Sequence, residues 1–150
     1  MYIQLIRNAT MRITYSGHTF LADPYFAPKH SRASYAGISP NPLVDLPLTP
    51  DEIMRGIEVI IVSHLHSDHF DPLAQELLPK DLPLFCQPGD AETIQGKGFR
   101  DVRPVGDEVT WQGITIRRVA GSHGSSAEVL GDMGQVSGFV FQAEGEPVVY

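Results

Sequence analysis

The chain has 150 residues, of which 42% are hydrophobic, so it is long enough for one domain with a core and too short for two ordinary domains. The formal net charge of -7 argues against general binding to nucleic acid or to an acidic membrane, because both need clustered Lys and Arg. A single cysteine, a polar start and no apolar run near the ~20 residues of a membrane span predict a soluble, cytoplasmic protein.

The first fifty residues are expected to form a hairpin followed by a long loop. Residues 2–23 alternate in a strand-like way about a turn at Ser16-Gly17, which predicts an opening β-hairpin that ends at Asp23-Pro24. Residues 25–50 are rich in Pro, Ser, Ala and Gly and have no periodicity. Loops of that length are often lids or binding loops, so we expect this one to shape a substrate pocket.

Helices and strands are predicted to alternate in the middle of the chain. Thr49 is the expected N-cap of a short helix that ends near Gly56, with Pro50 at its first position and Glu52 at its third. The apolar, β-branched run at residues 58–63 is typical of a strand covered on both faces. A helix at 71–78, a strand at 82–87 and a helix at 90–96 complete an order that implies a partly parallel sheet.

The last third of the chain is predicted to be mainly β-structure. Strands are expected at residues 102–105, 108–112 and 114–120, and residues 137–142 and 147–150 are expected to pair as a hairpin. Glu128 and Asp132 are expected in a solvated, Gly-rich loop. We expect one domain over residues 1–150, truncated at its C-terminal end, because the sequence stops in mid-strand at Tyr150.

Four potential metal ligands follow the buried strand within six positions: His64, His66, Asp68 and His69. Independent placement would give this ordered pattern in only about 0.0006 of chains of this composition. Extended residues two apart project to the same side, so His64 and His66 can converge on one ion, while Asp68 and His69 can face a second. The alternative is a polar loop whose histidines only cap the helix that begins at Asp71.

A third protein ligand is needed, because catalytic sites usually have three such ligands and one open position. His123 is the candidate, since it follows a strand and is flanked by a serine and glycines that let backbone approach an ion. Asp23 is expected either to hydrogen-bond a ligand histidine from behind or to serve as a turn residue. Cys86 is expected in the core, and His18 and His30 are expected to be surface or turn residues.

The motif resembles the metallo-β-lactamase superfamily, whose His-x-His-x-Asp-His pattern is matched by His64, His66, Asp68 and His69. More narrowly, residues 6–10, 20–24, 41–47 and 137–140 resemble the branch with ascorbate-6-phosphate-lactonase-like proteins and other metal-dependent hydrolases. The resemblance implies an αββα sandwich in which His64, His66 and His123 hold one metal and Asp68 and His69 contribute to a second. It also implies that a bridging aspartate and a last histidine of the family would lie beyond Tyr150.

These expectations together predict a metal-dependent hydrolase with one or two divalent ions, zinc or manganese. A metal-bound hydroxide would attack an ester, lactone, amide or phosphoester of a small molecule, and Asp68 would orient the water. Two alternatives stay open: a phosphodiesterase or nuclease of the same fold, although Lys and Arg are scattered, and a non-catalytic metal-binding half-domain. A small-molecule substrate is the expected partner, no nucleic acid or membrane is expected, and self-association as a homo-oligomer is left open.

Overall fold

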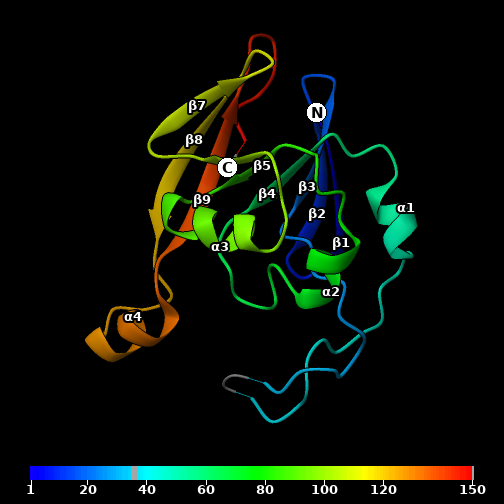
Figure 1. The fold of residues 1–150 in the computed structure, drawn as a ribbon, viewed down its shortest axis with the longest axis vertical. Helices are drawn as coiled ribbons and strands as arrows, with labels where there is room; N and C mark the ends of the chain where they lie inside the picture. The colour runs from blue at the N-terminus through cyan, green and yellow to red at the C-terminus, as the bar shows by residue number, and fades with distance from the viewer. Residues whose placement is uncertain (35–36, 150) are drawn as a thin grey trace.

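The computed structural model describes residues 1–34 and 37–149, and its centre is a six-stranded mixed sheet (Figure 1). The strands lie side by side in chain order. The first three are antiparallel, and from the third onward neighbouring strands are parallel, which confirms the predicted partly parallel sheet. The six strands are β1 (Tyr2–Arg7), β2 (Thr10–Tyr15), β3 (His18–Ala22), β4 (Val59–Val62), β5 (Leu84–Cys86) and β6 (Val102–Pro104).

The predicted N-terminal hairpin is present as β2 and β3. Its turn residues Ser16 and Gly17 have φ values of 48° and 81°, the left-handed pair that a tight two-residue hairpin turn needs. The structure adds β1, which pairs with the outer side of β2 through an irregularity between Leu5 and Arg7. The sequence pattern therefore placed the turn correctly but missed that residues 2–15 already contain a second antiparallel pair.

Helices cover one face of this sheet. They are α1 (Pro50–Met54), α2 (Pro72–Leu77) and α3 (Ala91–Gly96), the last preceded by the 3-10 turn η1 (Pro88–Asp90). The predicted capping box of α1 is formed, since the Glu52 N–H donates to Thr49 Oγ1 and the Thr49 N–H donates to the Glu52 carboxylate. None of the helices within the described ranges is both long and apolar enough to cross a bilayer.

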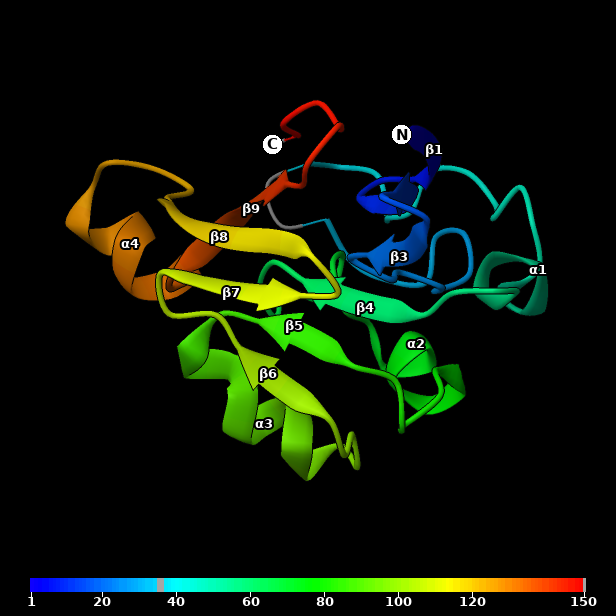
Figure 2. The ribbon, with the colours of Figure 1, turned by 90° about the horizontal axis from the view of Figure 1, so that it is seen from above.

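The opposite face is covered by a three-stranded antiparallel sheet, so the layers run helix, sheet, sheet (Figure 2). Its strands are β7 (Glu108–Trp111), β8 (Ile114–Gly121) and β9 (Val136–Gln142). The strand predicted at 102–105 does not join these strands but becomes β6, parallel to β5. The predicted hairpin partner at 147–150 is reduced to one bridge between Phe141 and Val149, and Tyr150 lies outside the described residues.

A helix, α4 (Ala127–Met133), stands where a loop was predicted. The hydroxyl of Ser126 accepts the N–H of Val129 and so supplies a local start signal, which the neighbouring glycines in the sequence obscured. Glu128 lies in the first turn of this helix and is exposed, whereas the side chain of Asp132 is outside what the structure describes.

Strand β4 is buried on both faces, as its apolar run predicted. Val59 and Ile61 belong to the core between the two sheets, and Ile60 and Val62 belong to the core under the helices. Because β3, β4 and β5 are parallel, their carboxyl ends meet at one edge of the sheet. The residues just beyond those ends are Asp23, Ser63 and Gln87, and this edge is where ligand sites of open α/β sheets form.

Candidate metal centre

Three histidines from two distant segments meet at this edge. His64 comes directly after β4 and is buried, His66 follows two residues later, and His123 extends from the end of β8 and is exposed. One ring nitrogen from each lies within 4.8 Å of the other two. The rings of His66 and His123 are stacked with centroids 4.9 Å apart. The histidines that the sequence proposed for one ion are thus neighbours in space.

The spacing of the ring nitrogens fits a divalent ion. Nε2 of His64 and Nε2 of His123 are 3.4 Å apart. An ion at 2.0–2.1 Å from each of two tetrahedrally arranged nitrogens would separate them by about 3.3–3.4 Å. Neutral imidazole is also the commonest ligand of transition metals, and the set contains no thiolate. The residues present therefore fit a divalent metal ion, as the sequence predicted.

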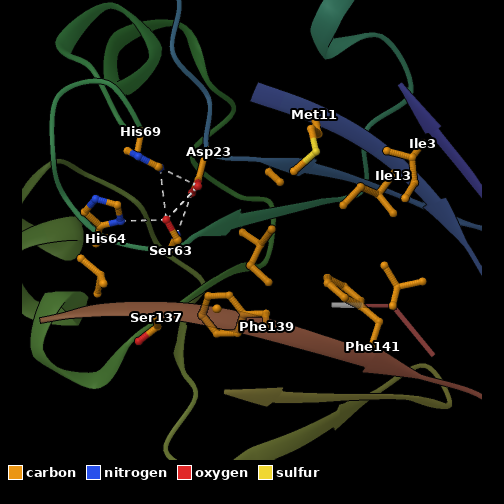
Figure 3. Close-up of a pocket in the computed structure, with 15 residues that line it drawn as sticks. Ile3, Met11, Ile13, Asp23, Ser63, His64, His69, Ser137, Phe139 and Phe141 are labelled. Carbon is orange, nitrogen blue, oxygen red and sulfur yellow. Dashed lines mark hydrogen bonds and ion pairs between the residues drawn. The ribbon is translucent and has the colours of Figure 1, made fainter. Parts of the chain in front are cut away.

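A hydrogen-bonded group of Asp23 and Ser63 orients the rings of His64 and His69 (Figure 3). The hydroxyl of Ser63 donates to Asp23 Oδ2 at 2.7 Å and lies 2.9 Å from Nδ1 of His64. Nδ1 of His69 lies 2.8 Å from the same Asp23 oxygen. Since a carboxylate only accepts, these bonds place the protons of His64 and His69 on Nδ1 and leave each Nε2 with a free lone pair. That is the tautomer in which Nε2 can bind a metal.

Asp23 is held in place by the neighbouring strand. Its N–H donates to the carbonyl of Ile61, and its Oδ1 accepts the N–H of Ser63 at 2.7 Å. Its φ of 45° is left-handed, a conformation that Asp and Asn adopt more readily than most residues. Asp23 therefore combines the two roles considered from the sequence, since it turns the chain after β3 and also bonds a motif histidine.

The remaining motif residues lie beside the three-histidine group. In the described ranges, Asp68 and His69 are not among the side chains whose ligand atoms converge. His69 packs on His64 with ring centroids 4.0 Å apart and is engaged by Asp23. Asp68 turns toward the long loop, where its Oδ1 lies 3.3 Å from Nη1 of Arg32. The structure thus assembles one set of ligands and leaves the predicted second set apart from it.

Burial makes the charged form of His64 unfavourable. Desolvation, reinforced by the charges of His69 and His66, lowers the pKa of His64 to about 4. The imidazole is therefore neutral at physiological pH, which is the form that binds metal. A metal ion can thus bind here without first displacing a proton from His64.

A cavity of about 620 Å³ opens onto the exposed side of the histidines. The long loop contributes Arg32 and Asn41 to its wall, which agrees with the expectation that residues 25–50 shape a pocket. A separate apolar cavity of about 340 Å³ lies between the two sheets behind Asp23 and His69 (Figure 3). The larger cavity is lined by Arg32, Asn41, Leu65, His66, Ser67, Asp68, His123 and Met133.

Three residues of this region were not singled out from the sequence. Ser63 could have been found, because it immediately precedes the motif at a strand end. Gln87 is buried and bonds both Ser137 and the carbonyl of Gln135, which ties the end of β5 to the start of β9. Arg32 lies in a loop without periodicity, so nothing local marked it.

The other histidines and the cysteine lie where the sequence suggested. His18 is 3.2 Å from the Glu58 carboxylate and contacts the edge of Trp111, at the start of β3 and so at the opposite end of the parallel strands from the motif. His30 is an exposed loop residue with a φ of 59°. Cys86 is buried in β5, and desolvation raises the pKa of its thiol to about 12. Cys86 is therefore a core residue.

Comparison with known proteins identifies the family of this chain. Residues 18–150 match a family model described as "Beta-lactamase superfamily domain". The chain is 39% identical over 155 residues to "UPF0173 protein YddR" of Bacillus subtilis (strain 168), covering all of this chain and 61% of that protein. It therefore spans about three fifths of the length of this relative.

Solved structures agree with the fold. A possible metal-dependent hydrolase from Veillonella parvula DSM 2008 superposes with a TM-score of 0.93 at 37% identity, over 99% of this chain and 60% of that one. The isothiocyanate hydrolase from Delia radicum gut bacteria superposes with a TM-score of 0.90 at 34% identity, again over 99% and 60%. The predicted sandwich class is confirmed by these similarities.

Proposed function

Because the chain belongs to the beta-lactamase superfamily, we propose that it is a metal-dependent hydrolase whose ion is held by His64, His66 and His123. The observation that carries the proposal is the 3.4 Å separation of the His64 and His123 Nε2 atoms. That distance matches one edge of a tetrahedral site, and three protein ligands leave a fourth position open for water.

A divalent ion held there would lower the pKa of water toward about 7 and polarise the bond under attack. The protein's own residues orient the metal ligands and the attacking water. Asp23 and Ser63 hold the proton of His64 on Nδ1, so that Nε2 stays available. Asp68 borders the same cavity as His66 and His123, and we assign to its carboxylate the task of orienting the attacking water.

The substrate is proposed to be a small molecule with an electrophilic carbon or phosphorus. The cavity of about 620 Å³ lies in the size range of small-ligand pockets. Esters, lactones, amides and phosphoesters all suit attack by activated water. Isothiocyanates join this set, because a structure 34% identical to this chain is an isothiocyanate hydrolase. A nucleic-acid substrate is not favoured, since Arg32 is the one Lys or Arg side chain among the described residues lining the cavity and it is paired with Asp68.

The test begins with chelator-treated protein that is reloaded with Zn²⁺ or Mn²⁺ and assayed on an aryl ester, a lactone, a phosphodiester and an aryl isothiocyanate. Hydrolysis of at least one substrate should depend on the ion. His123→Ala should abolish both turnover and tight metal binding, because it removes one of three ligands. His18→Ala is the matched control, since His18 is remote from the cavity and its partly exposed pair with Glu58 contributes little stability.

The outcomes separate the proposal from its alternatives. Metal-dependent turnover that His123→Ala abolishes and His18→Ala preserves supports a hydrolase. Tight metal binding without turnover on any substrate class would favour the non-catalytic metal-binding reading. Equal metal content in wild-type protein and His123→Ala would refute the proposed ligand set.

A further inference from the structure

A second cavity, of about 430 Å³, lies between the long loop and the end of β1. Arg32, Asn41 and Asp68 line both this cavity and the one over the histidines, so the two cavities adjoin. The N–H of Arg32 donates to the Asn41 carbonyl at 2.9 Å, which holds the loop side of the shared border in place. A small molecule bound over the histidines can therefore extend into the second cavity.

Two residues that line the second cavity each carry a buried polar atom without a hydrogen-bond partner among the described residues. The atoms are the hydroxyl of Tyr25 and Nε of Arg7, and the two residues are only 1% and 6% exposed. Buried polar groups of this kind nearly always have a partner. Both groups carry a proton that they can donate, so the missing partner is an acceptor.

The charge of Arg7 points to an acceptor that is negatively charged. Both Nη atoms of its guanidinium donate to backbone carbonyls, which carry no net charge. Desolvation lowers the pKa of Arg7, and the carboxylates of Asp71 and Asp45 oppose this effect without forming an ion pair with it in the described ranges. Because a buried charge is costly unless it is paired, an anion in the cavity would stabilise this side chain.

The Tyr25 hydroxyl is positioned to donate to such an anion. The Arg7 guanidinium packs over its ring at 4.9 Å, and its N–H donates to the Thr10 hydroxyl at 2.9 Å. Burial raises the pKa of Tyr25, partly offset by the charge of Arg32, so the hydroxyl is protonated at neutral pH. Arg32 can only donate, and Asp68 already accepts from Arg32 at 3.3 Å. An acceptor for the hydroxyl proton must therefore come from a ligand.

The remaining lining limits the kind of anion. Two guanidiniums, of Arg7 and Arg32, and one carboxylate, of Asp68, leave the lining with one positive charge in excess. A carboxylate balances this charge, whereas a phosphate monoester, with a charge of about −1.5 to −2, exceeds it. Apolar side chains complete the wall and fit the carbon skeleton of an organic acid: Ile6, Pro42, Leu43 and Val44.

We propose that the cavity beside Arg7 and Tyr25 binds the carboxylate of a small organic acid, and that this carboxylate belongs to the substrate. The first part rests on the two unpartnered donors and the buried charge. The second part rests on the proposed function, because the hydrolysable bond of the same molecule would lie in the adjoining cavity over the histidines.

The carboxylate site is tested on chelator-treated, metal-free protein by an NMR titration with benzoate and with its neutral analogue benzamide. Tyr25→Phe removes the hydroxyl and keeps the ring. Arg32→Gln is a second variant, which leaves the lining without net charge. Tyr2→Phe is the matched control, because Tyr2 is 62% exposed and lines neither cavity. Thermal unfolding of each variant checks that it is folded.

We expect benzoate to bind at least about tenfold more tightly than benzamide. Tyr25→Phe should weaken benzoate binding about tenfold, the loss expected for one hydrogen bond to a charged group, and Arg32→Gln should weaken it as well. Tyr2→Phe should bind as wild type does. The melting temperature of Tyr25→Phe should be unchanged or raised, because its hydroxyl has no partner to lose in the described protein.

The assignment to the substrate is tested with Zn²⁺-loaded protein and two esters of equal chain length. Monophenyl adipate carries a carboxylate where phenyl hexanoate carries a methyl group. Tyr25→Phe should raise the KM for monophenyl adipate about tenfold and leave the KM for phenyl hexanoate within about twofold. Benzoate should compete with monophenyl adipate.

Each outcome decides one part of the proposal. Equal affinity for benzoate and benzamide, or benzoate binding that Tyr25→Phe leaves unchanged, would overturn the carboxylate site. Benzoate binding with no effect of Tyr25→Phe on monophenyl adipate would overturn the assignment to the substrate and indicate a site for a free carboxylate. Absence of turnover on every ester would overturn the proposed function and the substrate assignment, whereas the metal-free titration would still decide the carboxylate site.

Discussion

The Nε2 atoms of His64 and His123 lie 3.4 Å apart although 59 residues separate them in the chain. Nδ1 of His64 is already engaged by Ser63, so its Nε2 carries the free lone pair and can only accept. Nε2 of His123 faces that lone pair, so the two nitrogens are placed to hold one ion between them.

The Asp23 carboxylate should control metal affinity without touching the ion. Asp23→Asn keeps a residue that tolerates the left-handed φ of 45° but weakens the bonds to Ser63 and His69. Loss of such an outer partner typically weakens metal binding by about 10–100-fold, and we expect a change of that size in a Zn²⁺ titration. Asp51→Asn, at an exposed position in α1, should bind as wild type does. An affinity within twofold of wild type for Asp23→Asn would contradict this role.

The metal-free protein should lose stability as the pH falls from about 6.5 to about 4. The pKa of His64 is lowered in the folded state to about 4, from 6.5 in an unfolded chain, so between these values the unfolded state binds more protons. Stability from this group is therefore full above pH 6.5 and declines on acidification, by about 3 kcal/mol in total. Urea unfolding in the presence of a chelator, at steps between pH 7 and pH 4, measures the loss.

His64→Gln is the comparison for that experiment, because glutamine does not titrate. Its free energy of unfolding should depend less on pH across the same range. If wild type and His64→Gln lose stability in parallel, the acid sensitivity arises from other groups.

Asp71 should stabilise both a helix and the long loop. Its carboxylate caps α2 by accepting the N–H groups of Leu73 and Ala74, and it also accepts the N–H of Phe26 at 2.7 Å. Asp71→Ala should lower the free energy of unfolding by about 2–3 kcal/mol, since it removes the cap and leaves a buried N–H without a partner. Asp71→Asn retains a capping oxygen and should lose less than half as much in the same urea titration. Equal losses for the two variants would show that charge, and not capping, matters here.

The thiol of Cys86 should be inert in the folded protein. It is fully buried in β5, and desolvation raises its pKa to about 12, so almost no thiolate is present at pH 8. A thiol reagent such as dithionitrobenzoate should release no chromophore from native protein within minutes and one equivalent in guanidinium chloride. Rapid reaction of the native protein would mean that β5 opens readily.

Local patterns in the sequence determined a large part of this protein. The turn at Ser16-Gly17, the Thr49 cap and the doubly buried strand before His64 were predicted, because each depends on a few neighbouring residues and their side-chain period. The metal motif was found in the same way, since its ligands lie within six positions. The family resemblance rested on those residues as well.

The tertiary structure alone decided which distant groups meet. That His123 reaches His64 depends on β8 and β4 ending at the same edge of two packed sheets, which the sequence could only suggest. The pairing of Asp68 with Arg32 depends on the path of a loop without periodicity, and no local signal encodes such a path. Spacing along the chain therefore identified which residues could bind a metal. The order of the strands decided which of these residues converge, and the path of the long loop decided which side chain pairs with Asp68.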